Sequence, residues 1–222
     1  MPGLRPSRRY LALHLPRWAT DCLKRADPAL AASDRPLVLW DRQRGAMKIV
    51  ALDGAASALG LHPGQNISDA RGIVRELEAR EIDRAFTERV FADFAGWHSN
   101  ASPIVSVLTD TAPWGDLVLD IAGVSHLFGG ERAMLQTLMG RLQSIGYTVS
   151  GAIASTVGAA WAVAHHATGR IVAEGDEDRA LRPLPVAALR LDPARVDALK
   201  QFGLKTVGQL YGRDRRALQA RF

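Results

Sequence analysis

The chain of 222 residues is 47% hydrophobic and 23% charged, which excludes a disordered protein and is enough for an extensive core. A single cysteine, Cys22, excludes a disulfide-based design, and no apolar run reaches membrane-span length, so we expect a cytoplasmic protein without membrane contact. The net charge is +5, and nine basic but only three acidic residues follow position 181. This asymmetry favours a polyanion such as nucleic acid as a partner, and a solvated helical face is the alternative.

The first part of the chain alternates short strands and short helices. Apolar alternation, turn residues and helix boundaries define these elements. The predicted elements are strands at 8–15, 36–40 and 47–52, a turn at 41–45, and helices at 18–25, 55–59 and 68–79.

The central part of the chain has longer elements. Apolar residues at a period of 3.6 residues mark two amphipathic helices, and an Ala-rich helix follows. The predicted elements are strands at 104–108, 117–121, 147–154 and 170–172, a hairpin turn at 114–115, and helices at 86–97, 134–145 and 157–166. The order is typical of a split βαβ, ferredoxin-like sheet in an α+β fold.

A charged linker at 174–178 precedes a helical tail. Residues 198–210 predict two short helices joined by a turn, in which Gly203 ends the first helix and Thr206 caps the second. Backbone N–H groups at the second helix start would point outward and suit a phosphate, as in a helix-hairpin-helix. A plain αα-hairpin without DNA contact is the alternative. The DNA-binding residues predicted here are Gly203, Leu204, Lys205, Thr206, Gly208, Arg215 and Arg216.

Histidines are scattered along the chain without metal-ligand spacing. The adjacent His165 and His166 point to different faces of a helix, which argues against a joint site. The pair Gly129-Gly130 precedes a helix but lacks the Lys-Ser/Thr of a phosphate loop. The sequence therefore predicts no metal site and no cofactor.

The order of elements resembles the Y-family, translesion DNA polymerases of the DinB and UmuC kind. The segments that carry the resemblance are ALGLHPGQNISDAR, LVLDIAGVSHLFGG, VSGAIAST and the hairpin-bearing tail. Two of them, LDIAGVSHLFGG and RPLVLW, are most similar to the ImuB-type branch found in bacterial mutagenesis cassettes.

The resemblance implies a division into three domains. These are an α+β palm with a ferredoxin-like βαβ sheet at 1–17 and 82–173, small α/β fingers at 18–81, and a helix-hairpin-helix thumb at 174–222. The chain stops at Phe222 within a helical pattern, before the family's little finger, so we expect it to be the N-terminal portion of a longer protein.

Active members of the family need a carboxylate at the end of the first strand and an Asp-Glu pair in a Ser-Ile-Asp-Glu-Ala motif. These groups hold two divalent cations. On this sequence the first carboxylate falls on His14, and the pair falls on Gly115 and Asp116. His suits softer metals than Mg²⁺, Gly has no ligand atom, and one carboxylate cannot hold two hard cations. The resemblance therefore implies degenerate catalytic positions and no catalytic residue.

Nucleotide contacts of the family fall on unsuitable residues as well. The Tyr-x-x-Arg of the fingers falls near Gly54 and Ser57, so the guanidinium that clamps the triphosphate is absent there. The bulky gate residue falls near Ala19, and the late palm Lys falls near His166 with a possible slip of one position.

The resemblance implies a non-catalytic scaffold in translesion mutagenesis. Its implied partners are DNA, a RecA-like accessory protein of the cassette, an error-prone C-family DNA polymerase subunit and the sliding clamp, with the protein contacts mostly beyond Phe222. Three alternatives stay open. The first is an active polymerase with displaced carboxylates, including a single-cation site at Asp116 and Asp120. The second is a protein-interaction module that does not bind DNA. The third is a nuclease-like helix-hairpin-helix enzyme, which no clustered acids in the sequence support.

Overall fold

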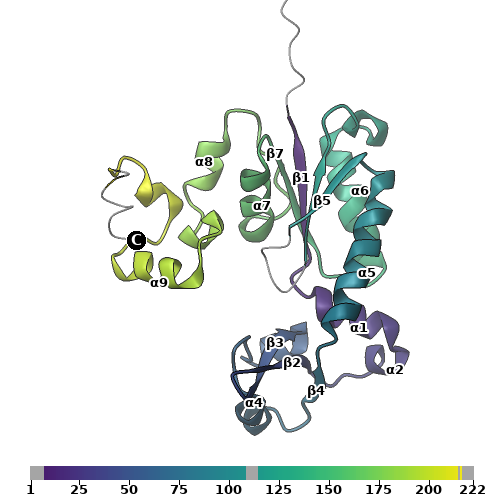
Figure 1. Ribbon diagram of the computed structural model, residues 1–222. Helices are drawn as coiled ribbons and strands as arrows, with labels where there is room; N and C mark the ends of the chain where they lie inside the picture. Colours follow the sequence, from purple (N-terminus) through teal and green to yellow (C-terminus); the bar gives the residue numbers. More distant parts are fainter. Residues whose placement is uncertain (1–7, 109–114, 215, 217–222) are drawn as a thin grey trace, which may run out of the picture.

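The computed structural model describes residues 8–108, 115–214 and 216. Figure 1 shows a four-stranded sheet with helices on both faces, a smaller region around a three-stranded sheet, and a helical C-terminal region. This mixture of antiparallel sheet and packed helices confirms the predicted α+β class. Among the described helices, none is long and apolar enough to cross a lipid bilayer.

The larger sheet has β1 (Tyr10–His14) near its centre. Its order is β5-β6-β1-β7, and β1 runs antiparallel to both neighbours, β6 (Asp116–Asp120) and β7 (Ser150–Ala154). The edge strand β5 (Ile104–Val107) pairs antiparallel with β6. Because both edges of β1 are hydrogen-bonded, the residue that ends it is held in a fixed position.

Side chains of β1 alternate between two hydrophobic clusters on opposite faces of the sheet. Leu11 and Leu13 join the cluster under α5 (Arg84–Trp97) and α6 (Glu131–Ser144), which cover one face. Ala12 joins the cluster under α7 (Val157–His166), which covers the other face (Figure 1). Since side chains in a strand alternate with a period of two, His14 shares the α7 face with Ala12.

The smaller sheet has the order β3-β2-β4. It contains β2 (Leu37–Gln43), β3 (Ala46–Leu52) and β4 (Glu78–Glu81). One face packs on α3 (Gly54–Ala58) and α4 (Ile67–Ile73), and the other packs on α1 (Trp18–Ala26) and α2 (Pro28–Ala31).

Two predictions in this region are wrong. The helix expected at 68–79 ends at Ile73, and residues 78–81 instead form β4, parallel to β2. A polar strand of Glu, Ala, Arg and Glu has no apolar alternation, so only its pairing with β2 reveals it. The turn expected at 41–45 is confined to Arg44 and Gly45, both with positive φ, because β2 continues to Gln43.

The prediction of a strand at 170–172 is also wrong. It contributes only an isolated parallel bridge between Ile153 and Ile171. Similarly, the strand predicted from residue 147 begins at Ser150. Part of the expected hairpin turn, Trp114, lies outside the described residues.

The C-terminal region consists of short helices. These are α8 (Glu177–Leu181), which starts inside the predicted linker, α9 (Pro193–Gln201), and single 3-10 turns at Val186–Leu189 and Val207–Leu210. The second helix of the predicted hairpin is therefore one 3-10 turn rather than an α-helix. Further 3-10 turns lie at His98–Asn100 and Ser125–Phe128.

Candidate functional site

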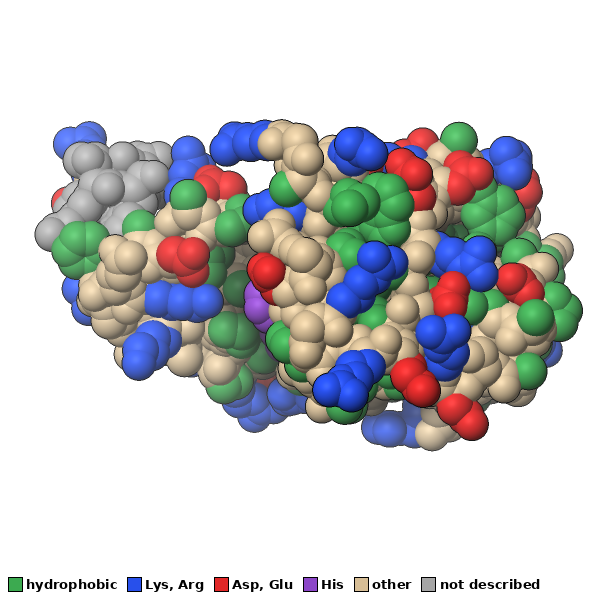
Figure 2. Space-filling view, turned by 90° about the horizontal axis from the view of Figure 1, so that it is seen from below, with side chains coloured by type: hydrophobic (Ala, Val, Ile, Leu, Met, Phe, Trp, Pro, Cys, Tyr) green, Lys and Arg blue, Asp and Glu red, His purple; other side chains and the backbone are tan. Residues whose placement is uncertain are grey.

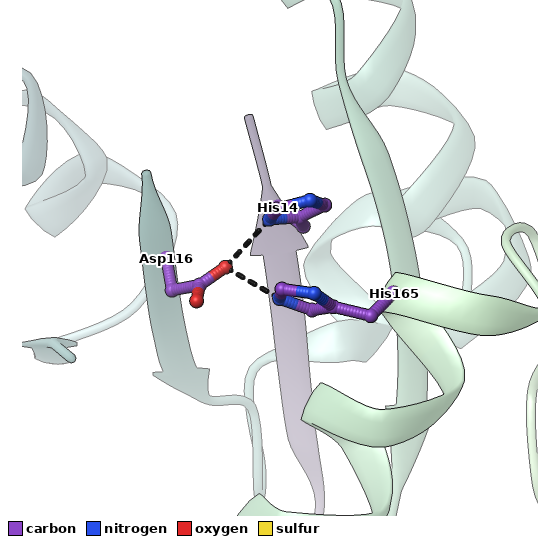
Figure 3. A group of neighbouring side chains, drawn as sticks. All are labelled: His14, Asp116 and His165. Carbon is purple, nitrogen blue, oxygen red and sulfur yellow. Dashed lines mark hydrogen bonds and ion pairs between the residues drawn. The ribbon is translucent and has the colours of Figure 1, made fainter. Parts of the chain in front are cut away.

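A cluster of polar side chains lies where β1 ends, on the α7 face of the larger sheet. The register of β1 and β6 places His14 directly opposite Asp116. The last turn of α7 adds His165 from a third element (Figure 3). His14 Nδ1 and His165 Nε2 each lie 2.8 Å from the same oxygen, Oδ1 of Asp116.

Trp161 completes the surroundings of this carboxylate. Its indole Nε1 donates to Oδ2 of Asp116 at 2.8 Å, so both carboxylate oxygens accept hydrogen bonds. Trp161 and His165 are four residues apart on α7, which puts them on one face of the helix. The ring of His165 stacks on His14 with centroids 3.5 Å apart and lies 3.9 Å from Trp161. The carboxylate is therefore fixed by three donors, and the rings that carry them pack on one another.

Electrostatics keep Asp116 ionised in spite of its burial. Burial alone would raise the pKa of Asp116, but hydrogen bonds from His14, His165 and Trp161 outweigh it and hold that pKa well below its usual range. Burial lowers the pKa of His165, and the neighbouring carboxylate opposes that shift. The side chain of Asp116 is only 3% exposed, whereas those of His14 and His165 are 22% and 17% exposed. The cluster is thus a buried anion under two histidines that solvent reaches.

Gly115 precedes this carboxylate and has no room for a side chain. A Cβ atom at Gly115 would lie 2.6 Å from the carbonyl oxygen of Leu15, which is backbone and cannot rotate away. The contact is held by a hydrogen bond from Leu15 N to Gly115 O of 2.8 Å. The backbone that follows β1 therefore occupies the place of a side chain at position 115.

Asp120 does not join Asp116. It lies at the other end of β6, opposite Tyr10 of β1 and Ile104 of β5. Its Oδ1 accepts from Ala122 N at 3.0 Å, so it caps the turn that follows the strand. The single-cation site considered for Asp116 and Asp120 is therefore not assembled.

Near the smaller sheet, Gly54 and Ser57 lie on α3, where the resemblance places the triphosphate contacts. A Cβ atom at Gly54 would lie 2.6 Å from Nη1 of Arg17, so the guanidinium of Arg17 packs where a side chain would start. Asp53 caps α3 and pairs with Lys24 at 2.6 Å. Ala19, at the expected gate position, is buried between α1 and the smaller sheet.

The predicted phosphate-binding amides are engaged inside the C-terminal region. The N–H groups of Val207 and Gly208 donate to the carbonyls of Leu184 and Arg182 at 2.9 Å each. The Gln209 side-chain oxygen accepts from the N–H groups preceding the turn, those of Lys205 and Thr206. The prediction that these amides point outward is wrong, because they dock the hairpin onto the chain at 182–184.

The remaining predicted DNA-binding residues have mixed environments. Gly203 ends α9 with a φ of +78°, as expected, whereas Leu204 is buried in a small apolar cluster and cannot contact DNA from there. A Cβ at Gly208 would lie 2.9 Å from the Arg182 carbonyl oxygen, which explains glycine at that position. Lys205 and Arg216 are exposed. Arg215 lies outside the described residues.

Basic side chains of the C-terminal region are partly neutralised by neighbouring acids. Arg195 pairs with Asp192 at 3.1 Å, and Lys200 lies 3.9 Å from Asp197. Figure 2, the view from below, shows Lys and Arg side chains scattered over this face, and histidine surface visible in a recess. Any polyanion contact on this face would therefore use separated cations.

His165 and Trp161 are the site residues that sequence reasoning missed. The adjacent histidines do face different sides, since His166 is not among the clustered side chains and its ring lies 6.2 Å from that of His165. The useful signal was the spacing of four between Trp161 and His165. The resemblance places the late palm Lys near His166, and a shift of the register by one position would put it at His165, which lies at the site.

Together, the sheet order and the covering helices define the fold of the Y-family polymerase catalytic core. The structure matches the crystal structure of DinB from Sulfolobus solfataricus with a TM-score of 0.73 at 14% identity, over 96% of this chain and 62% of that chain. It matches the insertion ternary complex of Dbh DNA polymerase with a TM-score of 0.75 at 14% identity, with the same coverage. At such identities the likeness shows the fold alone.

The chain belongs to the impB/mucB/samB family, which matches residues 14–165. Protein ImuB of Caulobacter vibrioides, in strains NA1000 / CB15N and ATCC 19089 / CIP 103742 / CB 15, is 39% identical over 165 residues. The match covers 74% of this chain and 35% of that protein, so the chain spans about a third of its relative. The predicted resemblance to the ImuB-type branch is confirmed.

Proposed function

We propose that this chain is the non-catalytic, polymerase-like core of a scaffold protein in a bacterial DNA-damage-induced translesion complex. The observation that carries the proposal is the donor set at the end of β1. Two imidazoles and one carboxylate meet there, and both oxygens of that carboxylate already accept hydrogen bonds.

The residues present do not fit a pair of Mg²⁺ ions. Mg²⁺ prefers an octahedral shell of oxygen ligands, usually including carboxylates. Among the residues that the structure describes, Asp116 is the single carboxylate in the cluster. Gly115 has no room for a side chain, and Asp120 caps a turn at the other end of β6. Neither Gly54 nor Ser57 offers a guanidinium to a triphosphate, and the guanidinium of Arg17, which packs against Gly54, comes from outside that motif. These residues therefore argue against nucleotide transfer by this chain.

The proposed setting is the one that the resemblance to the ImuB-type branch implies. We infer a cytoplasmic protein whose partners are DNA, a RecA-like accessory protein, an error-prone C-family polymerase subunit and the sliding clamp. The division into a palm at 1–17 and 82–173, fingers at 18–81 and a thumb at 174–222 is part of the same proposal. Exposed cations such as Lys205 and Arg216 support a DNA contact through the thumb that is weak and independent of sequence.

A primer-extension assay tests the absence of catalysis. The chain is incubated with a primer-template, all four deoxynucleotides and either Mg²⁺ or Mn²⁺, with Dbh DNA polymerase as the positive control. We expect no template-dependent extension by this chain. Extension that is abolished by Asp116→Ala would overturn the proposal in favour of an active polymerase with displaced carboxylates.

A further inference from the structure

The cluster at the end of β1 does more than lack the carboxylates that a pair of Mg²⁺ ions needs: it brings three possible ligand atoms together. One ligand atom from each of His14, Asp116 and His165 lies within 4.8 Å of the other two. The three residues come from β1, β6 and α7, so they are distant in sequence, and the packed sheet brings them together. Figure 3 shows both rings directed at the same carboxylate oxygen.

The distances are close to those of a metal centre. Zn²⁺ bonds nitrogen and oxygen at about 2.0–2.1 Å, which places tetrahedral ligand atoms about 3.4 Å apart. The two nitrogens lie 2.8 Å from Oδ1 of Asp116, so each ring needs to move away from that oxygen by about 0.6 Å. A bound Zn²⁺ would take the place of the proton through which each ring nitrogen donates to the ionised carboxylate.

The donor types select the class of metal. Two imidazoles and a carboxylate suit Zn²⁺ and its neighbours Co²⁺ and Ni²⁺, whereas Mg²⁺ prefers an all-oxygen shell. Partial exposure of His14 and His165 leaves a side of the cluster open to water, which would be the fourth ligand.

An outer partner already orients the carboxylate. The indole of Trp161 donates to Oδ2 of Asp116 at 2.8 Å, and that oxygen is not the one shared by the histidines. Metal-binding carboxylates are commonly held by such a second hydrogen bond, which directs the other oxygen at the ion. This arrangement is more than three polar residues that happen to lie close together.

We propose that His14, Asp116 and His165 bind one divalent transition-metal ion of the Zn²⁺ class, at the place where the polymerase resemblance implies paired Mg²⁺. Trp161 orients the Asp116 carboxylate toward that ion. Such an ion would tie the end of β1 to β6 and α7. This proposal goes beyond the proposed function, because Zn²⁺ can bind here whether or not the chain transfers nucleotides.

The test uses the whole chain purified without a histidine tag and stripped with a chelator. We expect saturable Zn²⁺ binding at one ion per chain by isothermal titration calorimetry, unaffected by millimolar Mg²⁺. Titration with Co²⁺ should give the intense visible absorption of a tetrahedral ion. Failure of both measurements on the unmodified chain would overturn the proposal, whatever the outcome of primer extension.

Variants assign the ligands. His14→Gln and His165→Gln should each weaken Zn²⁺ binding at least about 10-fold, and Trp161→Phe should weaken it by about 10–100-fold. His166→Gln is the matched control, because His166 adjoins His165 but contributes no atom to the cluster, and its affinity should be unchanged. Circular dichroism checks that each variant is folded. Equal affinity in His14→Gln, His165→Gln and the unmodified chain would overturn the assignment, as would loss of binding only in His166→Gln.

Discussion

At the scale of single residues, Gly115 and His98 are both closely packed at positions that tolerate little change. Gly115 lies against the Leu15 carbonyl, so any Cβ there meets backbone at 2.6 Å. His98 is fully buried beside Phe94, and within the described part of the chain its Nε2 has no hydrogen-bond partner. Each residue therefore leads to a prediction about the free energy of unfolding.

Gly115→Ala is expected to lower the free energy of unfolding by about 1–3 kcal/mol, because the new methyl group must displace the end of β1. Gly140→Ala, on the exposed side of α6 with nothing near its Cβ position, should raise it by about 0.5–1 kcal/mol. Urea denaturation followed by circular dichroism measures both. If Gly115→Ala left the free energy of unfolding unchanged, the close approach of Gly115 to the Leu15 carbonyl oxygen would not constrain the site.

Stability should also fall as the solution becomes acidic. Burial lowers the pKa of His98 below its usual value near 6.5, while its Nδ1 donates to the Phe94 carbonyl. The unfolded chain therefore binds a proton more readily, so the stabilisation is complete above pH 6.5 and is lost as the pH falls through the lowered value.

The measurement is urea unfolding at pH 7.5 and pH 5.5, which bracket the usual His pKa of about 6.5, with a chelator present. His98→Gln, which does not titrate, should be less stable overall but should lose less stability between these two conditions. Burial also lowers the pKa of His165 and His166, so a part of the pH dependence will remain in the variant. An unchanged pH dependence would rule out His98 as a contributor.

At the scale of elements, α7 positions the site through its N-terminal cap. The Thr156 hydroxyl accepts from Ala159 N at 3.1 Å, and the helix then runs under the sheet to deliver Trp161 and His165. Its bounds, Val157–His166, match the sequence prediction, because the cap and an Ala-rich apolar run are local signals. By contrast, β4 escaped prediction because each of its residues pairs with a residue of β2 that lies 41 positions earlier in the chain, as in Leu37 with Glu78.

Thr156→Ala should therefore lower the free energy of unfolding by about 1 kcal/mol, since the Ala159 N–H in the first turn of α7 loses its acceptor. Thr156→Ser keeps the hydroxyl and should stay close to the unmodified chain. Thermal and urea unfolding compare the two variants. If Ala and Ser were equally stable, the cap would not be the origin of the effect.

At the scale of the whole molecule, the C-terminal region carries the excess of basic residues. The backbone amides of its hairpin, however, donate hydrogen bonds to residues 182–184 of the same region. A phosphate contact there depends on exposed side chains. Such a contact is electrostatic and releases counterions, so its strength must fall with salt.

Lys205→Glu and Arg216→Glu should weaken binding to primer-template DNA and reduce the salt dependence, log K against log[salt], by about 1 for each phosphate that the variant no longer neutralises. Arg132→Glu, an equal charge change in the first turn of α6, is the control and should leave the slope unchanged. Fluorescence anisotropy at several salt concentrations measures these slopes. Unchanged affinity in both thumb variants would favour a module that does not bind DNA through this region.

The sequence by itself determined the fold class, most helices and strands, the family resemblance and the presence of His14, Gly115 and Asp116 at the critical positions. These features depend on local periodicity, capping and residue identity, which are written along the chain. Tertiary structure alone decided that His165 joins His14 at one oxygen of Asp116, that Gly115 is closed by the Leu15 carbonyl, and that the hairpin amides are occupied. Each of these depends on atoms from distant segments meeting at van der Waals or hydrogen-bond range, and the spacing of residues along one chain does not encode such distances.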